Sequence, residues 1–332
     1  MPAAPPDTEP VATTHDANPG RSTGQRSHSW PVLPLAVVGW FVGLLPWFVA
    51  RRTVGTFGTP WNPRNDLREA LLPFHHDRLT LLLSIALFAG GLAGLAGCWV
   101  HPRHGRRLAA LALAVLGAAT AVIVSVGQTL SLHPDLGGTG ATATSPETAL
   151  VLLTVAGAAT GLVLGLFVSI GGPVARIVAG APLAVIAANW VGLLVTFATA
   201  DPSTPTRHET LPTVLWVLTG ILVGVCLALG PLPASAGRAI GVALLWLVGL
   251  GLLWLTQSAF TAVRYFLEGV RGVATDTAEI RALAHDVLRI FGDTLAPDFA
   301  PWRVALVALV VGSLGLLARV TVARRGTGST PG

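Results

Sequence analysis

The segment 51–78 brings together side chains that could carry out chemistry. It contains Asp66, His75 and Asp77, which are the residue types of acid and base catalysts and of metal ligands. Adjacent histidines point apart on a helix, so His75 would need partners from elsewhere in the chain. In the simpler interpretation, Asp66 caps a short helix that ends near Leu72, with Glu69 three residues later in a capping-box spacing.

A second set of polar side chains interrupts long apolar stretches. Gln128, Asn189 and Gln257 lie within such stretches, and Arg264 follows at the end of one. Buried amides need hydrogen-bond partners, so these residues could join neighbouring helices. They could also line a wet cavity. We predict a polar cavity that opens to the outer side, with Asn189 near its floor and Arg264 at its mouth.

The elements that must position these residues are hydrophobic helices. Of the 332 residues, 52% are hydrophobic and only 11% are charged, whereas soluble domains carry about 25% charged residues. A helix needs roughly 20 apolar residues to cross a bilayer. Eight stretches qualify, and none contains Asp, Glu or His; they are 31–50, 79–100, 108–132, 148–170, 175–199, 211–230, 239–263 and 303–322. The sequence predicts an all-α polytopic transmembrane helical bundle.

The ends of the chain and its orientation follow from composition and from the arginines. Residues 1–30 are rich in Pro, Thr, Ser and Asp, which predicts a disordered cytoplasmic tail before a single transmembrane domain over 31–325 and a disordered tail over 326–332. The short connections 101–107, 171–176 and 231–238 contain Arg but no acid. Since Lys and Arg in short loops mark the cytoplasmic side, both termini are predicted to be cytoplasmic. The absence of Lys and the abundance of Ala and Gly indicate a bacterial chain, and so a bacterial inner membrane.

Residues 276–292 have the pattern of an amphipathic helix between the seventh and eighth spans. Leu283, Val287, Leu288 and Phe291 share one face, and acidic and basic residues take the other. This pattern is typical of a short helix that lies in the outer membrane interface.

Small residues recur at intervals of four along three of the spans. The glycines concerned are Gly90 and Gly94, then Gly157, Gly161 and Gly165, then Gly220 and Gly224. Such a spacing lets helices approach closely. The stripes predict tight packing within the bundle, or a contact with a second copy of the chain or with another membrane protein.

Other partners are limited by the composition. The spans predict contact with membrane lipids, and scattered arginines do not form the basic patch that nucleic acid requires. Cys98 and Cys226 lie in apolar stretches and are interpreted as packing residues. The sequence predicts no bound metal and no cofactor.

Two classes of function remain. The spans contain no acidic residue, His or Lys that could form a proton relay, and the chain has no P-loop. We therefore favour a non-enzymatic membrane protein, transport-related or scaffolding. The alternative is an extracytoplasmic-facing membrane enzyme that acts on a lipid-linked substrate, with Asp66, His75 and Asp77 as its catalytic candidates.

Overall fold

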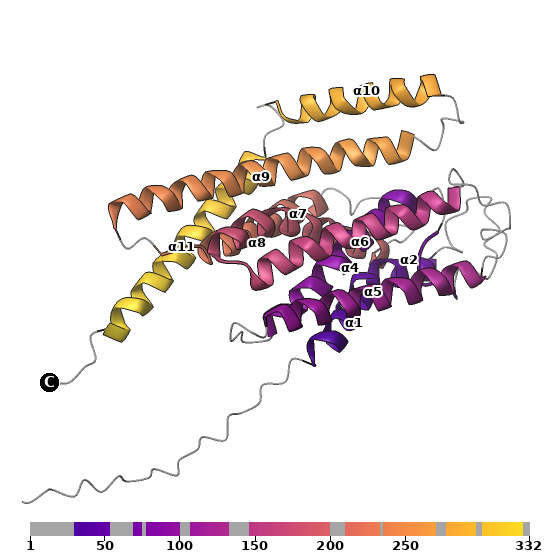
Figure 1. Ribbon diagram of the computed structural model, residues 1–332. Helices are drawn as coiled ribbons and strands as arrows, with labels where there is room; N and C mark the ends of the chain where they lie inside the picture. Colours follow the sequence, from indigo (N-terminus) through magenta and orange to yellow (C-terminus); the bar gives the residue numbers. More distant parts are fainter. Residues whose placement is uncertain are drawn as a thin grey trace, which may run out of the picture.

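The computed structural model describes residues 30–53, 69–74, 78–99, 107–132, 146–199, 210–232, 235–269, 277–296 and 301–327. The regular structure in these ranges is helical (Figure 1). The α-helices are α1 (Val32–Gly43), α2 (Leu45–Thr53), α4 (Leu79–Leu95), α5 (Arg107–Leu132), α6 (Pro146–Ile170), α7 (Pro173–Ala198), α8 (Thr210–Ala228), α9 (Ala236–Gly269), α10 (Thr277–Thr294) and α11 (Trp302–Thr327), and the 3-10 helix η2 (Ala96–Trp99) follows α4.

Eight helical stretches in these ranges are long and apolar enough to cross a membrane, and they coincide with the eight predicted spans. Helices α1 and α2 together form the first of them, over Val32–Arg51. The seventh is longer than predicted, because α9 has 34 residues and continues beyond its apolar stretch at both ends. The all-helical class is confirmed for the described residues.

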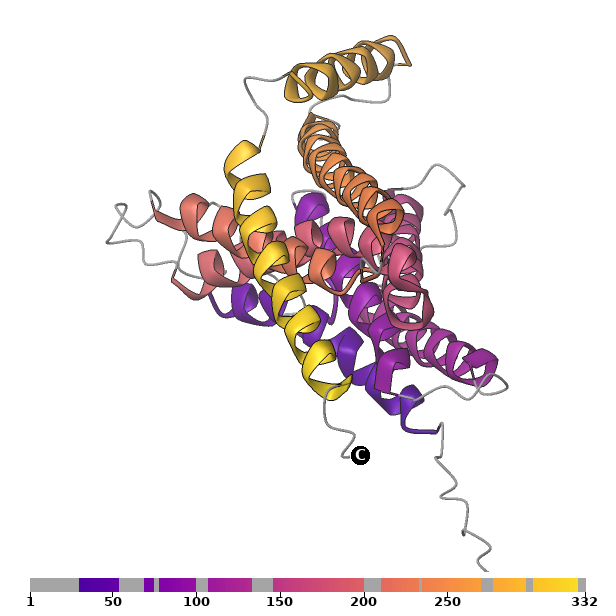
Figure 2. The same cartoon turned by 90° about the vertical axis from the view of Figure 1, so that its left-hand side faces the viewer.

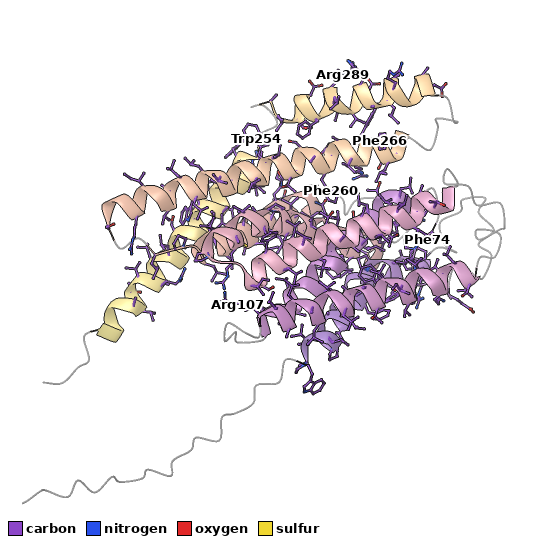
Figure 3. The ribbon with its side chains drawn as sticks, viewed as in Figure 1. Phe74, Arg107, Trp254, Phe260, Phe266 and Arg289 are labelled. Carbon is purple, nitrogen blue, oxygen red and sulfur yellow. The ribbon has the colours of Figure 1, made fainter. Side chains whose placement is uncertain are left out.

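The two ends of the bundle are marked by Phe74 and Arg107, which lie at opposite ends in Figure 3. We call them the Phe74 end and the Arg107 end. The Phe74 end is the one that the arginine pattern predicts to be extracytoplasmic.

Helix α4 lies at the centre of the bundle and makes its most extensive contact with α6. The glycines of both helices face each other at this contact. A Cβ atom added to Gly161 would overlap the carbonyl oxygen of Leu87, and one added to Gly90 would overlap the carbonyl oxygen of Ala158. The backbones therefore touch, which is the packing that the glycine spacing predicts.

Helices α8 and α11 form a second seam of this kind. A Cβ on Gly220 would lie 2.7 Å from Cβ of Val307, and one on Gly224 would lie 2.7 Å from Cβ of Val311. Arg319 of α11 donates to the carbonyl oxygens of Ala228 and Gly230, where α8 ends. A guanidinium here satisfies carbonyls that the helix itself leaves unpaired and complements the helix dipole.

The break between α1 and α2 follows from Pro46, which has no N–H to donate to the preceding turn. The backbone N–H of Trp47 donates to the carbonyl of Leu44 at 3.0 Å, instead of continuing the α-helical pattern to Gly43. The Gly43 carbonyl instead accepts a hydrogen bond of 2.7 Å from Nε1 of Trp190 on α7. The break thus becomes a link between the first and fifth spans.

The C-terminal helices are less enclosed than α4. Figure 1 shows α10 alongside α9, and Figure 2 shows α11 crossing the direction of its neighbours. Nε1 of Trp254 and Oγ of Ser258 each donate to the carbonyl of Thr294 at 3.2 Å, which fixes the end of α10 against α9. Leu283 packs against Gly269, whereas Leu288, which the pattern placed on the same apolar face, is 70% exposed. Position in a membrane interface stays a prediction for α10.

The close contact at the glycine seams can be tested by comparing how alanine changes the free energy of unfolding at two glycines. We expect Gly161→Ala to lower the free energy of unfolding by about 1–3 kcal/mol, because its Cβ meets the Leu87 backbone. Thermal unfolding in a mild detergent measures the change. Gly251→Ala is the matched control, because no described atom lies within 4 Å of an added Cβ there.

The control substitution removes a helical glycine without a clash, so it should be neutral or stabilise by up to about 1 kcal/mol. Equal destabilisation by both substitutions would contradict the close contact between α4 and α6.

Candidate functional site

A polar cavity of about 200 Å³ lies between α4, α7 and α9. Its lining combines charged, amide, hydroxyl and apolar side chains: Arg78, Thr80, Leu81, Ser84, Asn189, Leu193, Phe260, Arg264 and Glu268. These residues come from the first turns of α4 and from the C-terminal halves of α7 and α9. We call this the polar cavity, and it lies toward the Phe74 end.

The wall from α4 is the start of the helix. Arg78 is the N-cap residue and its side chain makes no capping hydrogen bond, and the first turn contains no acid. The Oγ of Ser84 donates to the Thr80 carbonyl at 2.8 Å, whereas the buried Oγ1 of Thr80 has no hydrogen-bond partner among the described residues. The first N–H groups of a helix lack partners within it and carry partial positive charge. Among the described residues, this wall therefore carries the charge of Arg78 and no carboxylate.

The wall from α7 is centred on Asn189. Its Nδ2 donates to the carbonyl of Val185 on the same helix at 3.0 Å. That bond uses one of the two amide N–H groups and leaves the other N–H and Oδ1 without a partner among the described residues. The neighbouring Trp190 is buried and stacks on Phe88 of α4, with ring centroids 4.6 Å apart. The aromatic contact holds this part of α7 against α4.

The wall from α9 carries an ion pair. Nε of Arg264 donates to Oε1 of Glu268 at 2.8 Å, one helical turn apart, and the two side chains are 65% and 46% exposed. An exposed pair of this kind contributes little to stability. Phe260 lies one turn before Arg264 and is directed from α9 toward the bundle (Figure 3).

The structure brings together two of the four predicted cavity residues, Asn189 and Arg264. Gln257 precedes Phe260 by three residues and is half-buried, but it does not line the polar cavity. Asp66, His75 and Asp77 lie outside the described residues. Among the described residues, no group of three or more His, Cys, Asp or Glu is placed to hold a metal ion.

Gln128 has a different role, since it holds the segment 69–74. Its Oε1 accepts from the Leu71 backbone N–H at 2.9 Å, and its Nε2 donates to the Glu69 carbonyl at 3.0 Å. Thr129 accepts from the Leu72 N–H at 3.1 Å, and Nε1 of Trp47 donates to the Ala70 carbonyl at 3.0 Å. We call these three side chains the segment clamp.

The segment held by the clamp differs from its prediction. A helix was expected to end near Leu72, but the backbone from Ala70 to Phe74 is not helical. Ala70, Leu72 and Phe74 are 0–3% exposed and pack inside the bundle. The clamp supplies the hydrogen bonds that this non-helical backbone needs away from water. Its apolar cluster includes Leu81, which also lines the polar cavity.

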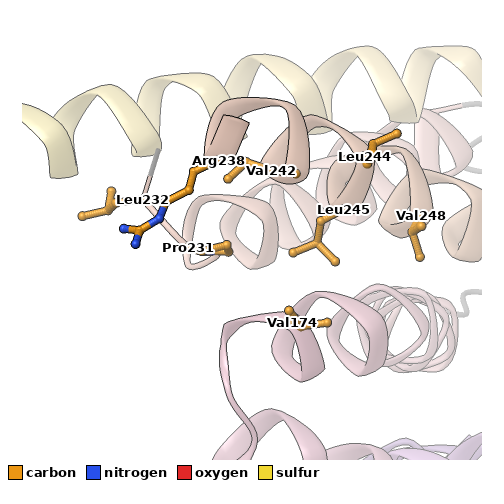
Figure 4. A pocket seen from close by; sticks show the side chains of 9 residues that line it. Val174, Pro231, Leu232, Arg238, Val242, Leu244, Leu245 and Val248 are labelled. Atoms are coloured by element: carbon orange, nitrogen blue, oxygen red, sulfur yellow. The ribbon is translucent and has the colours of Figure 1, made fainter. Parts of the chain in front are cut away.

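A second, larger hollow lies near the Arg107 end. It has a volume of about 470 Å³ and an apolar lining apart from one arginine: Val174, Pro231, Leu232, Arg238, Gly241, Val242, Leu244, Leu245 and Val248 (Figure 4). Several of these side chains are strongly exposed, including Leu244 at 59% and Val174 at 55%. Such an open apolar groove suits contact with lipid chains more than recognition of a polar ligand.

The sequence reasoning missed most of the charged and hydroxyl lining of the polar cavity. Arg78, Thr80, Ser84 and Glu268 were not among the predicted site residues. The sequence contained one usable indication, which is spacing. Thr80 and Ser84 lie four residues apart and so share a helix face, and the same holds for Arg264 and Glu268. Nothing in that spacing indicates that the two faces meet.

Comparisons of the chain with protein-family models, with curated proteins and with solved structures found no match. The fold defines the class: a helical chain whose eight apolar helices are compatible with a multi-pass membrane protein.

The segment clamp predicts different outcomes for two glutamines. Gln128→Ala leaves the Leu71 N–H and the Glu69 carbonyl without these partners, so we expect about 1–3 kcal/mol of destabilisation. We also expect faster amide hydrogen exchange over 69–74. Gln257→Ala is the control, since its side chain makes no hydrogen bond to the described residues. Unchanged exchange over 69–74 in Gln128→Ala would show that the clamp does not hold the segment.

Proposed function

We propose that the chain is a multi-pass protein of the bacterial inner membrane, with both termini in the cytoplasm, and that its role is non-enzymatic. It binds a polar ligand in the polar cavity from the extracytoplasmic side, as a transport-related or scaffolding component. The observation that carries this proposal is the convergence of Asn189 and Arg264 with Arg78 and Ser84 at the Phe74 end of an otherwise apolar bundle. Polar and charged side chains that converge at the end of long apolar helices support a binding site there.

The enzymatic alternative has one observation in its favour. Arg78 lines the polar cavity and directly follows the catalytic candidates His75 and Asp77 in the sequence. Against it, the carboxylate in the described lining is that of Glu268, which is exposed and paired with Arg264. A general acid or base must be free to exchange a proton with the substrate near the reacting atoms. The lining therefore favours binding over catalysis.

Lipids and other chains are the partners of this proposal. The exposed apolar faces of α9 and α11 and the groove of Figure 4 suit acyl chains. The glycine stripes of α4, α6 and α8 pack against neighbours within the chain. An association with a second copy or with another membrane protein stays a prediction, and α9 offers the uncovered glycines Gly237, Gly241 and Gly251 for it.

Orientation is tested with reporter fusions. An enzyme that is active only outside the cytoplasm should be inactive when fused after Arg325 and active when fused at Gly138. Both fusions must be expressed to similar levels, measured by immunoblotting. Activity at Arg325 and none at Gly138 would reverse the orientation and place the polar cavity on the cytoplasmic side.

Access to the polar cavity is tested by cysteine labelling in intact cells. With Cys98 and Cys226 first replaced by Ser, we expect a membrane-impermeant maleimide to label Asn189→Cys from outside. Ala188→Cys is the matched control, because it has the same depth on α7 but is 3% exposed and should react slowly. Labelling of Asn189→Cys only after the membrane is permeabilised would overturn an outward opening.

A further inference from the structure

The polar cavity has more hydrogen-bond donors than its own acceptors use. Arg78 has no carboxylate partner in the part of the chain that the structure describes, and Arg264 has one in Glu268. Asn189 keeps one amide N–H, and also its Oδ1, after its bond to Val185. With two arginines and one glutamate, the described lining carries one positive charge in excess. Its chemistry is complementary to an anion.

The arrangement of the donors favours a phosphate group among the common biological anions. The donors belong to α7 and α9 and to the start of α4, so they are not confined to one helix. A carboxylate offers two oxygens in one plane, whereas a phosphate offers three or four oxygens in a tetrahedron. Guanidinium groups bind phosphate oxygens in pairs, and helix N-termini bind them through backbone N–H groups.

We infer that the polar cavity binds a phosphate group between Arg78 at the start of α4 and Arg264 of α9. The inference rests on the function proposed above and names the chemical class of its ligand. A volume of about 200 Å³ is smaller than the usual 300–1,000 Å³ of a drug-sized site, so it suits a headgroup or a free ion. Leu81, Leu193 and Phe260 give the lining an apolar part, which suits a lipid phosphate as well as inorganic phosphate.

Glu268 offers a substitution that should strengthen phosphate binding instead of weakening it. Its carboxylate competes with a phosphate for Arg264, since both are acceptors for the same guanidinium. The exposed pair is weak, so it can be exchanged at little cost. Removing the negative charge at this position should strengthen phosphate binding, whereas removing either arginine should weaken it.

The experiment measures binding to the full chain in a maltoside detergent, which contains no phosphate. The probes are sodium phosphate, dioctanoyl phosphatidic acid and dioctanoylglycerol, which lacks the phosphate, all at constant ionic strength. Loss of a charge-assisted contact predicts about tenfold weaker binding for Arg78→Gln and for Arg264→Gln. We expect severalfold tighter binding for Glu268→Gln. Arg107→Gln, at the opposite end of the bundle and outside both hollows, is the control and should leave the affinity unchanged.

Each outcome decides the inference. The inference is supported if both phosphate probes bind, if the two arginine variants weaken their binding and if Glu268→Gln strengthens it. Binding of phosphatidic acid alone supports a lipid headgroup, and binding of phosphate alone supports a free ion. Equal binding of dioctanoylglycerol, or variants that all weaken binding alike, would overturn it. If phosphate fails to bind while Asn189→Cys is labelled from outside, the cavity is open as proposed and only the ligand class is wrong.

Discussion

The backbone contact between α4 and α6 is the interaction on which the rest of the bundle depends. Lipid chains are as apolar as leucine, so helices in a bilayer associate through close packing instead of through the hydrophobic effect. The facing glycines let the two backbones touch, and Gly43 of α1 lies as close to Ala89 on another side of α4. Most of α4 is buried, so the helix is fixed in position, and its first turn forms one wall of the polar cavity.

The second constraint is that backbone polar groups away from water must find partners within the protein. The described structure meets it with a small set of side chains. Trp190 donates to the carbonyl that the Pro46 break leaves free, and the segment clamp donates to and accepts from residues 69–74. These polar side chains therefore stabilise irregular backbone, and only the polar groups left over are available for a ligand.

The eight long apolar helices were predictable, because apolar stretches of this length are typical of helices that cross a bilayer and composition alone reveals them. The glycine spacing also predicted the seams, but it could not name the partners: the α6 stripe meets α4 and the α8 stripe meets α11. Spacing defines a face of one helix and contains no information about its neighbour. Gln128 was expected in the cavity for the same reason. Its real partner is a non-helical backbone segment, for which the sequence pattern had indicated a helix.

The walls of the polar cavity differ in how firmly they are held. The α4 wall is fixed from several sides, whereas α9 is mostly uncovered. A Cβ added to Gly251 of α9 would meet no described atom within 4 Å. Arg264 is thus carried by a weakly packed helix and paired with an exposed carboxylate. An anion that bridges Arg78 and Arg264 would add a polar link to the limited contact that α4 and α9 already make. Because α10 is fixed to α9 through Thr294, such a ligand would also influence where α10 lies.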